Sequence, residues 1–358
     1  MNCKFFAGCP NLFPNRSFLL FFLFCLFFHP LSAQENRLIG RWVLDFVTDA
    51  NKMISDIHSP MFSSETIYEI SKDQLKINDQ AFKARYDDLR NIDMVHRSLF
   101  YSFDSDYLVV QERGDPDHVF YFLKDSIFIK TYPEFQAKYA ERNGERLLIE
   151  DTFNKVRFTS NMDFANSMEF YSSELKKKSR SEFFCEVEFV LDTNNVIRDV
   201  VFLNPLDLKL ETDLRKALNK ISSFFFNNLK ENVLVVQRIH YSTFDKKDVG
   251  QEIKDAISSF QQGDDLYQEG KYEEALPHLE KAIQVPVNRK QFFYYNDCLR
   301  TLGICYLMLN RGEDACKVFN DWGGSSNFNV RNYLRFFCTN KVILTAPDKE
   351  RMIENIER

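Results

Sequence analysis

The sequence predicts a multidomain protein that joins an antiparallel β domain, a small α+β domain and a short all-α region. Three observations predict this fold class. Segments that alternate apolar and polar residues, separated by polar turns, fill residues 37–160. A strand, a turn, a second strand, a helix and a third strand follow. Beyond residue 252, apolar residues recur at helical spacing. The chain has 358 residues, which is enough for two or three domains.

Residues 1–33 have the composition of a secretory signal peptide. Lys4 and Arg16 are the only charged side chains in this stretch, and the apolar run SFLLFFLFCLFF extends from Ser17 to Phe28. The stretch ends in small residues at Ala33. The run is too short for a membrane-spanning helix, which needs about 20 apolar residues. We therefore expect cleavage after Ala33, an exported protein and no retained transmembrane helix.

The net charge argues against a nucleic-acid partner, and the cysteine count argues against a disulfide framework. The formal net charge is −6 at pH 7, so no nucleic-acid partner is expected. The cysteines beyond the leader are Cys185, Cys298, Cys305, Cys316 and Cys338. An odd number without regular spacing does not indicate a disulfide framework. Because each lies in an apolar pattern, we interpret all five as core residues, with one bridge in the helical part as the alternative.

Residues 34–160 are expected to form one antiparallel β domain. Four hairpins are predicted, at residues 65–77, 99–112, 118–132 and 146–160. Serial hairpins indicate a meander, and closure into a barrel would remove its exposed edges.

The first strand of this domain carries Gly40 and Trp42 as a Gly-x-Trp motif. With the hairpin series, this motif resembles the lipocalin-like domains of bacterial envelope proteins. The resemblance implies a barrel that holds a small apolar ligand. The alternative is that Trp42 closes the barrel floor and the chain's own side chains fill the interior.

A basic stretch at residues 161–181 is interpreted as a linker, and residues 182–248 as an α+β domain. VEFVL and VIRDVVF flank the turn at residues 192–195. A helix with apolar residues at helical spacing and a strand ending at Phe244 complete a ββαβ order.

This unit resembles the C-terminal domain of TonB. The matching positions are Ile197, Asp199, Val200, Leu214, Ala217, Leu218, Phe224 and Phe226. The resemblance implies a bacterial envelope location, in the periplasm or at the cell surface of a Gram-negative-type organism. A three-stranded sheet has open edges that can take up a peptide by strand addition. The alternative is that neighbouring parts of the chain cover those edges.

Residues 252–323 contain a helical pattern that occurs twice. FQQGDDLYQEGKYEEALPHLEKAIQVP (260–286) and LRTLGICYLMLNRGEDACKVFNDW (299–322) resemble tetratricopeptide repeats. Gly303 in the second copy matches Gly263 in the first. The residues expected to pack the helices together are Gly263, Ala275, Ala282, Gly303, Ala315 and Phe319. Residues 324–358 are expected to form a capping helix and a tail.

The first helices of such repeats line a concave face. By repeat position, the residues expected there are Phe260, Asp264, Tyr267, Arg300, Ile304 and Leu307. They predict a groove for a protein or peptide partner. The alternative is an array that only holds the domains together.

Candidate chemistry is sparse in the sequence. No nucleophile elbow or phosphate-binding loop occurs, and no two histidines have metal-ligand spacing. RGDPDHVF groups Asp115, Asp117 and His118, but its Gly and Pro indicate a turn. No catalytic residue, metal or cofactor is therefore predicted. We expect a protein-binding scaffold or adaptor, with carriage of a small apolar ligand in the barrel as the alternative.

Overall fold

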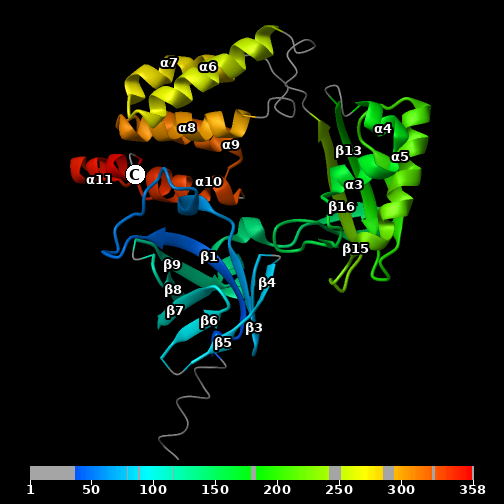
Figure 1. The fold of residues 1–358 in the computed structure, drawn as a ribbon, viewed down its shortest axis with the longest axis horizontal. Helices are drawn as coiled ribbons and strands as arrows, with labels where there is room; N and C mark the ends of the chain where they lie inside the picture. Colours follow the sequence, from blue (N-terminus) through cyan, green and yellow to red (C-terminus); the bar gives the residue numbers. More distant parts are fainter. Residues whose placement is uncertain are drawn as a thin grey trace, which may run out of the picture. The chain divides into compact units, whose positions relative to one another are not determined.

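The computed structural model describes residues 37–78, 80–87, 89–115, 117–178, 183–241, 251–284, 294–324 and 327–356 (Figure 1). The expected signal peptide, the last two residues of the first repeat copy (285–286) and the end of the third predicted strand at Phe244 lie outside these residues. The chain divides into two compact units. One comprises the chain to Ser55 and Ser64–Phe128, and the other comprises Asp56–Ser63 and the chain from Ile129 onward.

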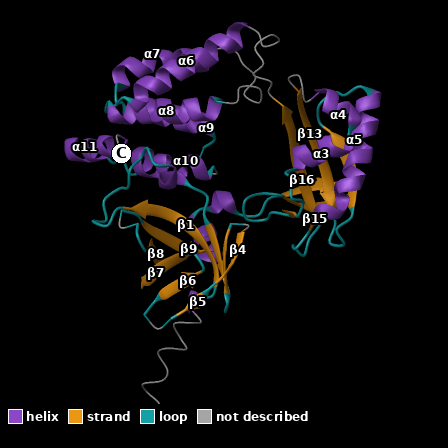
Figure 2. Ribbon diagram, in the orientation of Figure 1, coloured by secondary structure: helices purple, strands orange, loops and turns teal. Residues whose placement is uncertain are grey.

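The first unit is a nearly closed, barrel-like antiparallel sheet, as the sequence predicts (Figure 2). Its strand order is β4-β3-β2-β1-β9-β8-β7-β6-β5. The strands are β1 (Gly40–Thr48), β2 (Ile67–Ile70), β3 (Gln74–Ile77), β4 (Gln80–Lys83), β5 (Arg85–Tyr86), β6 (Asn91–Met94), β7 (Arg97–Asp104), β8 (Tyr107–Glu112) and β9 (Val119–Lys124). The predicted hairpins at residues 65–77 and 99–112 are confirmed as β2–β3 and β7–β8. Only Ala84 separates the two edge strands in sequence.

Apolar side chains fill the interior of this sheet. They are Leu38, Trp42, Leu44, Val47, Tyr68, Ile70, Leu75, Ala84, Ile92, Leu99, Leu108, Val110 and Phe122. Trp42 is buried, and its indole Nε1 donates to the carbonyl of Leu38 at 2.8 Å. The hydrogen bond satisfies the one polar group of this ring, so that the ring can pack fully inside the core.

The other two predicted hairpins are wrong. After β9 the chain enters helix α2 (Asp125–Thr131) at the expected turn. Strand β11 (Glu145–Ile149) pairs with β10 (Tyr139–Arg142), and β12 (Arg157–Phe158) pairs with β15 (Phe225–Phe226). The turn between β10 and β11 is Asn143-Gly144, with φ angles of 52° and 78°. This dipeptide favours the two-residue turns that connect paired strands, and it decides the hairpin position.

The second unit contains a mixed sheet of order β10-β11-β16-β13-β14. The predicted order of strand, strand, helix and strand occurs as β13 (Phe183–Leu191), β14 (Ile197–Phe202), α5 (Leu208–Ile221) and β16 (Val233–Tyr241). The Asp192 carboxylate accepts from the backbone amides of Asn194 and Val196, both at 2.8 Å, which fixes the predicted turn. Asp207 caps α5 by accepting from the amide of Leu210 at 2.8 Å.

The expected linker at residues 161–181 is instead largely helical. It forms α3 (Phe164–Tyr171) and α4 (Ser173–Lys178). Phe164, Met168 and Leu175 are buried in the same core as the sheet and α5. The lysine run misled the prediction, because basic residues occupy only the exposed end of α4 while its apolar residue packs inward.

The C-terminal part is a helical region, as predicted. Its elements are α6 (Gln251–Gln268), α7 (Tyr272–Gln284), α8 (Tyr295–Met308), α9 (Gly312–Trp322), α10 (Phe328–Tyr333), the π-helical turn η4 (Leu334–Thr339) and α11 (Ala346–Ile356). A Cβ added to Gly263 would lie 2.7 Å from Cγ of Leu279, and a Cβ added to Gly303 would lie closer still to the Phe319 ring. Helices α6 and α7 therefore approach closely at one glycine, and α8 and α9 at another.

The two helix pairs also end their first helices in the same way. The amide of Gly270 donates to the Tyr267 carbonyl at 2.9 Å, and that of Lys271 to the Leu266 carbonyl at 2.9 Å. At the end of α8, Asn310 donates to Leu307 at 3.1 Å and Arg311 to Tyr306 at 2.8 Å. Gly270 and Asn310 both have positive φ, at 73° and 60°. Each helix thus ends in a Schellman motif, which requires a left-handed residue.

Candidate functional site

The predicted concave-face residues do not form an open surface. Phe260, Tyr267, Ile304 and Leu307 are buried, with exposed fractions of 7% or less. Asp264 and Arg300 are half-buried. The predicted packing residues Gly263, Ala275, Ala282, Gly303, Ala315 and Phe319 are all buried at the helix contacts.

A segment from the N-terminal part of the sequence contacts this helical region. Asp56–Ser63 lies between β1 and β2 in sequence but belongs to the second unit. We call it the inserted segment. It ends in a short 3₁₀ helix, η1 (Pro60–Ser63). Ile57 and Phe62 are its buried apolar side chains, at 0% and 1% exposure. Met61 between them is exposed at 46%.

The inserted segment folds through its own short-range hydrogen bonds. The Asp56 carboxylate accepts from the amide of His58 at 2.9 Å, and the Ser59 hydroxyl accepts from the amide of Met61 at 3.2 Å. Pro60 at the first position of η1 suits the helix because its missing N–H would have no helical partner. Ile57 and Phe62 are thereby presented as two anchors, five residues apart.

Side chains of the helices bind the backbone carbonyls of the inserted segment. The Tyr333 hydroxyl donates to the Ile57 carbonyl at 2.8 Å, and Nδ2 of Asn332 donates to the Phe62 carbonyl at 2.7 Å. Arg300 donates to the His58 carbonyl. These three contacts recognise main chain rather than side chain. We call Tyr267, Tyr272, Arg300, Asn332 and Tyr333 the helical face.

Aromatic side chains hold the Phe62 anchor. Its ring centroid lies 4.8 Å from that of Tyr333, 5.9 Å from that of Phe336 and 6.2 Å from that of Phe337. The Tyr333 ring stacks in turn on Phe319, with centroids 4.7 Å apart. Because Phe319 lies against Gly303, a continuous row of contacts joins the α8–α9 crossing to the anchor.

His58 contributes the polar side chain of the inserted segment. Its Nδ1 lies 2.6 Å from the Tyr267 hydroxyl, and its ring stacks near Tyr272 at a centroid distance of 6.1 Å. Burial, with a smaller effect from the Arg300 charge, lowers the pKa of His58 to about 3. The imidazole is therefore neutral at pH 7. Burial also raises the pKa of Tyr267, so its hydroxyl keeps its proton.

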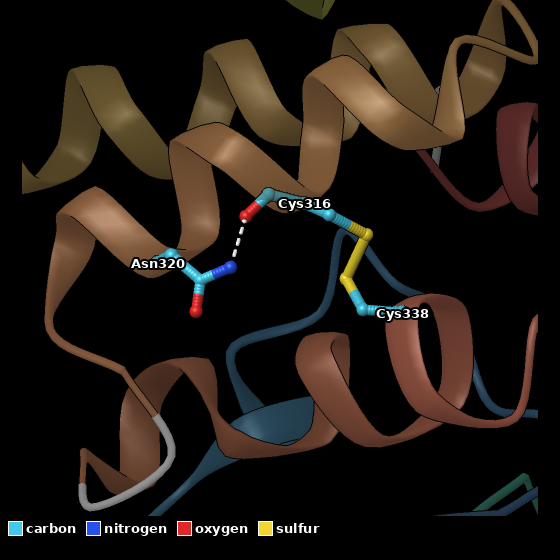
Figure 3. Close-up of a disulfide and its surroundings, with 3 residues drawn as sticks. All are labelled: Cys316, Asn320 and Cys338. Carbon is cyan, nitrogen blue, oxygen red and sulfur yellow. Dashed lines mark hydrogen bonds between the residues drawn. A yellow bond between two sulfur atoms is a disulfide. The ribbon is translucent and has the colours of Figure 1, made fainter.

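A disulfide joins Cys316 on α9 to Cys338 on η4 (Figure 3). The prediction that all five cysteines are simple core residues is wrong for this pair, and the alternative of one bridge in the helical part is confirmed. Cys185, Cys298 and Cys305 are free and buried. The bridge attaches η4, which follows directly on Asn332 and Tyr333, to the second helix pair. It closes a sequence separation of 22 residues.

The sheet of the second unit is less open than predicted. Strand β11 pairs in parallel with β16, with Leu148 opposite Val233, and so covers one edge of the three predicted strands. Strand β14 is an edge within the described chain. It bulges at Asp199, which has a φ of 53°. Val201 and Leu203 at this edge are exposed, at 37% and 48%.

Groups that could support catalysis or metal binding are few in the described part of the chain. No cluster of three or more His, Cys, Asp or Glu residues there could hold a metal ion. Nδ1 of His118 lies within hydrogen-bond distance, 2.9 Å, of Oδ2 of Asp115. Burial raises the pKa of the Cys185, Cys298 and Cys305 thiols to about 12, which keeps them in the unreactive protonated form. Among the described helices, none combines the length and the apolar character that a membrane span requires.

No protein-family model matches the sequence, and a search of curated proteins likewise finds no match.

Sequence reasoning missed the inserted segment and its partners Asn332 and Tyr333. One signal was available. The stretch between β1 and β2 is long for a hairpin connection and contains Ile57, Met61 and Phe62 among turn-forming residues. Long connections that carry apolar residues commonly have a function or a packing partner of their own.

Proposed function

We propose that this chain is an exported envelope protein of a Gram-negative-type bacterium that acts as a protein-binding scaffold or adaptor, without catalysis. One observation carries the proposal. The helical face binds Asp56–Ser63 through three main-chain carbonyls and through the Phe62 ring, which contacts Tyr333, and the Ile57 side chain is also buried. A surface of this kind suits a short peptide, because main-chain contacts give affinity and anchor pockets give selectivity.

The repeated geometry supports a tetratricopeptide-like array for the helical region. Gly263 and Gly303 occupy the two helix crossings, and the same Schellman motif ends both α6 and α8. Such arrays characteristically bind peptides with the first helices of their repeats. Here α6 supplies Tyr267 and α8 supplies Arg300 to the helical face.

The TonB-C-like part offers a second contact surface. Its β14 edge is accompanied by the exposed side chains of Val196, Val201 and Leu203. The Asp199 bulge interrupts this edge, and bulges discourage uncontrolled strand pairing. The edge is therefore proposed as a subsidiary surface, and the helical face as the principal one.

Export to an oxidising compartment fits the Cys316–Cys338 bridge. Structural disulfides persist in the periplasm and on cell surfaces and are rare in reducing cytosol. Together with the leader-like composition of residues 1–33, the bridge supports a location in the periplasm or at the cell surface.

Carriage of a small apolar ligand is the alternative function. The lipocalin-like unit has the required sheet, but its interior positions are occupied by large side chains, including Trp42 and Phe122. In a barrel packed in this way, the protein's own side chains fill the interior in place of a ligand. Protein binding is accordingly the preferred function.

A crosslinked pull-down from native envelopes tests the proposal, with residues 34–358 as bait. All baits carry Ile57→Ala and Phe62→Ala, which free the helical face of the inserted segment. In this background Asn332→Ala weakens the helical face, Val201→Lys together with Leu203→Lys alters the β14 edge, and Val95→Lys is a matched control at an 81% exposed position. We expect one partner that is captured by the control and lost with Asn332→Ala. Loss with the edge variant alone would move the site to β14. If no bait captures a partner, the scaffold function is wrong, and extraction of bound lipid becomes the next test.

A further inference from the structure

We propose that the helical face recognises a short peptide with an aliphatic residue and, five residues later, an aromatic residue, and that the inserted segment competes with this partner. The inference rests on the proposed scaffold function. The inference adds the chemistry of the partner peptide to that function. It also makes Asp56–Ser63 an internal ligand that must leave the helical face before the partner binds.

The spacing of the anchors comes from the two buried side chains. Ile57 and Phe62 are the apolar residues of the segment that are fully buried, and the exposed Met61 shows that the intervening position is not selected. The Phe62 ring lies among Tyr333, Phe336 and Phe337, which favours an aromatic residue because rings at these distances attract one another beyond their burial.

The main-chain contacts require a bent rather than an extended ligand. The Ile57 carbonyl accepts from Tyr333 and the Phe62 carbonyl from the adjacent Asn332. Two neighbouring residues on one helix can reach carbonyls five residues apart only because the segment turns at η1. Proline or serine in the middle of the partner peptide would favour this turn, as Ser59-Pro60 does in the segment.

Charge selects against a basic residue after the aliphatic anchor. His58 occupies this position as a neutral ring beside Tyr267, and the Arg300 guanidinium donates to its carbonyl. A lysine or arginine there would bring a second positive charge into a buried place next to Arg300. That arrangement is unfavourable through both burial and repulsion.

Competition follows from the covalent attachment of the inserted segment. A tethered ligand acts at an effective concentration on the order of 1 mM. A free peptide of the same sequence with an intrinsic Kd of about 10 μM would then bind the intact protein about 100-fold more weakly than a protein whose segment has been released.

The test is a titration of the full mature chain with a fluorescent peptide of residues 55–64. Ile57→Ala together with Phe62→Ala removes both anchors and releases the segment. Met61→Ala is the matched control, since Met61 lies in the same turn but is exposed. We expect the double variant to bind the peptide at least tenfold more tightly than wild type, and Met61→Ala to behave as wild type.

Two altered peptides test the recognition rule. Serine at both anchor positions, and lysine at the position of His58, should each weaken binding to the double variant at least tenfold. A double variant that keeps its helical circular dichroism and its disulfide, yet binds the peptide no more tightly than wild type does, overturns the inference. If the double variant does not fold, Phe62→Leu keeps a buried apolar side chain and should bind the peptide about threefold more tightly than wild type.

The outcomes separate the inference from the proposed function. If envelope pull-downs capture a partner but the peptide does not bind the released helical face, the scaffold function stands and the partner uses another surface. If the peptide binds and no envelope partner is found, the recognition chemistry stands and the scaffold function fails.

Discussion

The Tyr333 hydroxyl donates a hydrogen bond of 2.8 Å to the carbonyl of Ile57, 276 positions earlier in the chain. This contact connects the C-terminal helices to a segment that interrupts the N-terminal β unit in sequence. Tyr333 also stacks on Phe319 and contacts Phe62. One side chain therefore contributes to helix packing and to retention of the inserted segment.

Tyr333→Phe should loosen the inserted segment while leaving the helices folded. The ring contacts remain, but the buried Ile57 carbonyl loses its donor, at a cost of about 1–3 kcal/mol. Hydrogen exchange at residues 57–62 should speed up, with little change in the amides of α8. Tyr86→Phe is the control, because it removes a 3.0 Å hydrogen bond to the Gln74 carbonyl at a more exposed place. Equal protection of residues 57–62 in wild type and Tyr333→Phe would contradict this role.

Gly303→Leu should separate α8 from α9. Any side chain at this position meets the Phe319 ring, so the helices must move apart at a cost of about 3 kcal/mol. Gly312→Ala is the control, since a Cβ there meets nothing within 4 Å. The measurement is thermal unfolding followed by circular dichroism. An unchanged melting temperature for Gly303→Leu would refute the proposed helix crossing.

Acid should release the inserted segment. The pKa of His58 is lowered to about 3 from 6.5, so the folded state disfavours its charged form. The stabilising contribution is complete above pH 6.5 and is lost as the pH falls toward 3, by about 1.4 kcal/mol per unit. At pH 5 the loss is about 2 kcal/mol.

The comparison variant for this pH effect is His58→Asn, which keeps an amide near the Tyr267 hydroxyl and does not titrate. Burial raises the pKa of Glu150 to about 7, so its contribution changes with pH in the opposite direction, improving as the pH falls. Subtracting the variant's pH profile from that of wild type removes this effect. Hydrogen exchange at residues 57–62 between pH 7 and pH 5 should show the His58 difference, and identical profiles would exclude it.

Reduction should destabilise the helical region. The Cys316–Cys338 bridge closes a separation of 22 residues, for which chain entropy predicts about 3 kcal/mol. Reducing agent should lower the melting temperature of wild type and leave that of Cys316→Ser with Cys338→Ser unchanged. An equal shift in both proteins would assign the effect to something other than this disulfide.

Regular local patterns made much of the fold predictable from sequence. Alternation in β7 and β8 predicted their hairpin, and helical spacing predicted α5 and the paired helices α6 to α9. Prediction failed where a distant partner decided the outcome. Strand β12 pairs with β15, which lies beyond α5 in the chain. The basic residues Lys176–Lys178 suggested a linker, but they belong to helix α4, whose Leu175 packs into the sheet core.

The helical face was only partly predictable. Tyr267 and Arg300 were expected on an inward face from their positions in the predicted repeats, and both contact His58 of the inserted segment. The contact of Asp56–Ser63 with these residues could not be predicted, because no periodic pattern in the sequence links Ile57 or Phe62 to Tyr333. That association depends on main-chain carbonyls and buried anchors, and these leave no regular spacing in the sequence.

The most direct test of protein binding at the helical face is a competed capture. Residues 34–358 are crosslinked in native envelopes with and without excess peptide of residues 55–64, beside a peptide with serine at both anchor positions. If the helical face binds the partner, the native peptide displaces the captured partner and the anchorless peptide does not. A partner that survives the native peptide, or that both peptides displace equally, would contradict binding at the helical face.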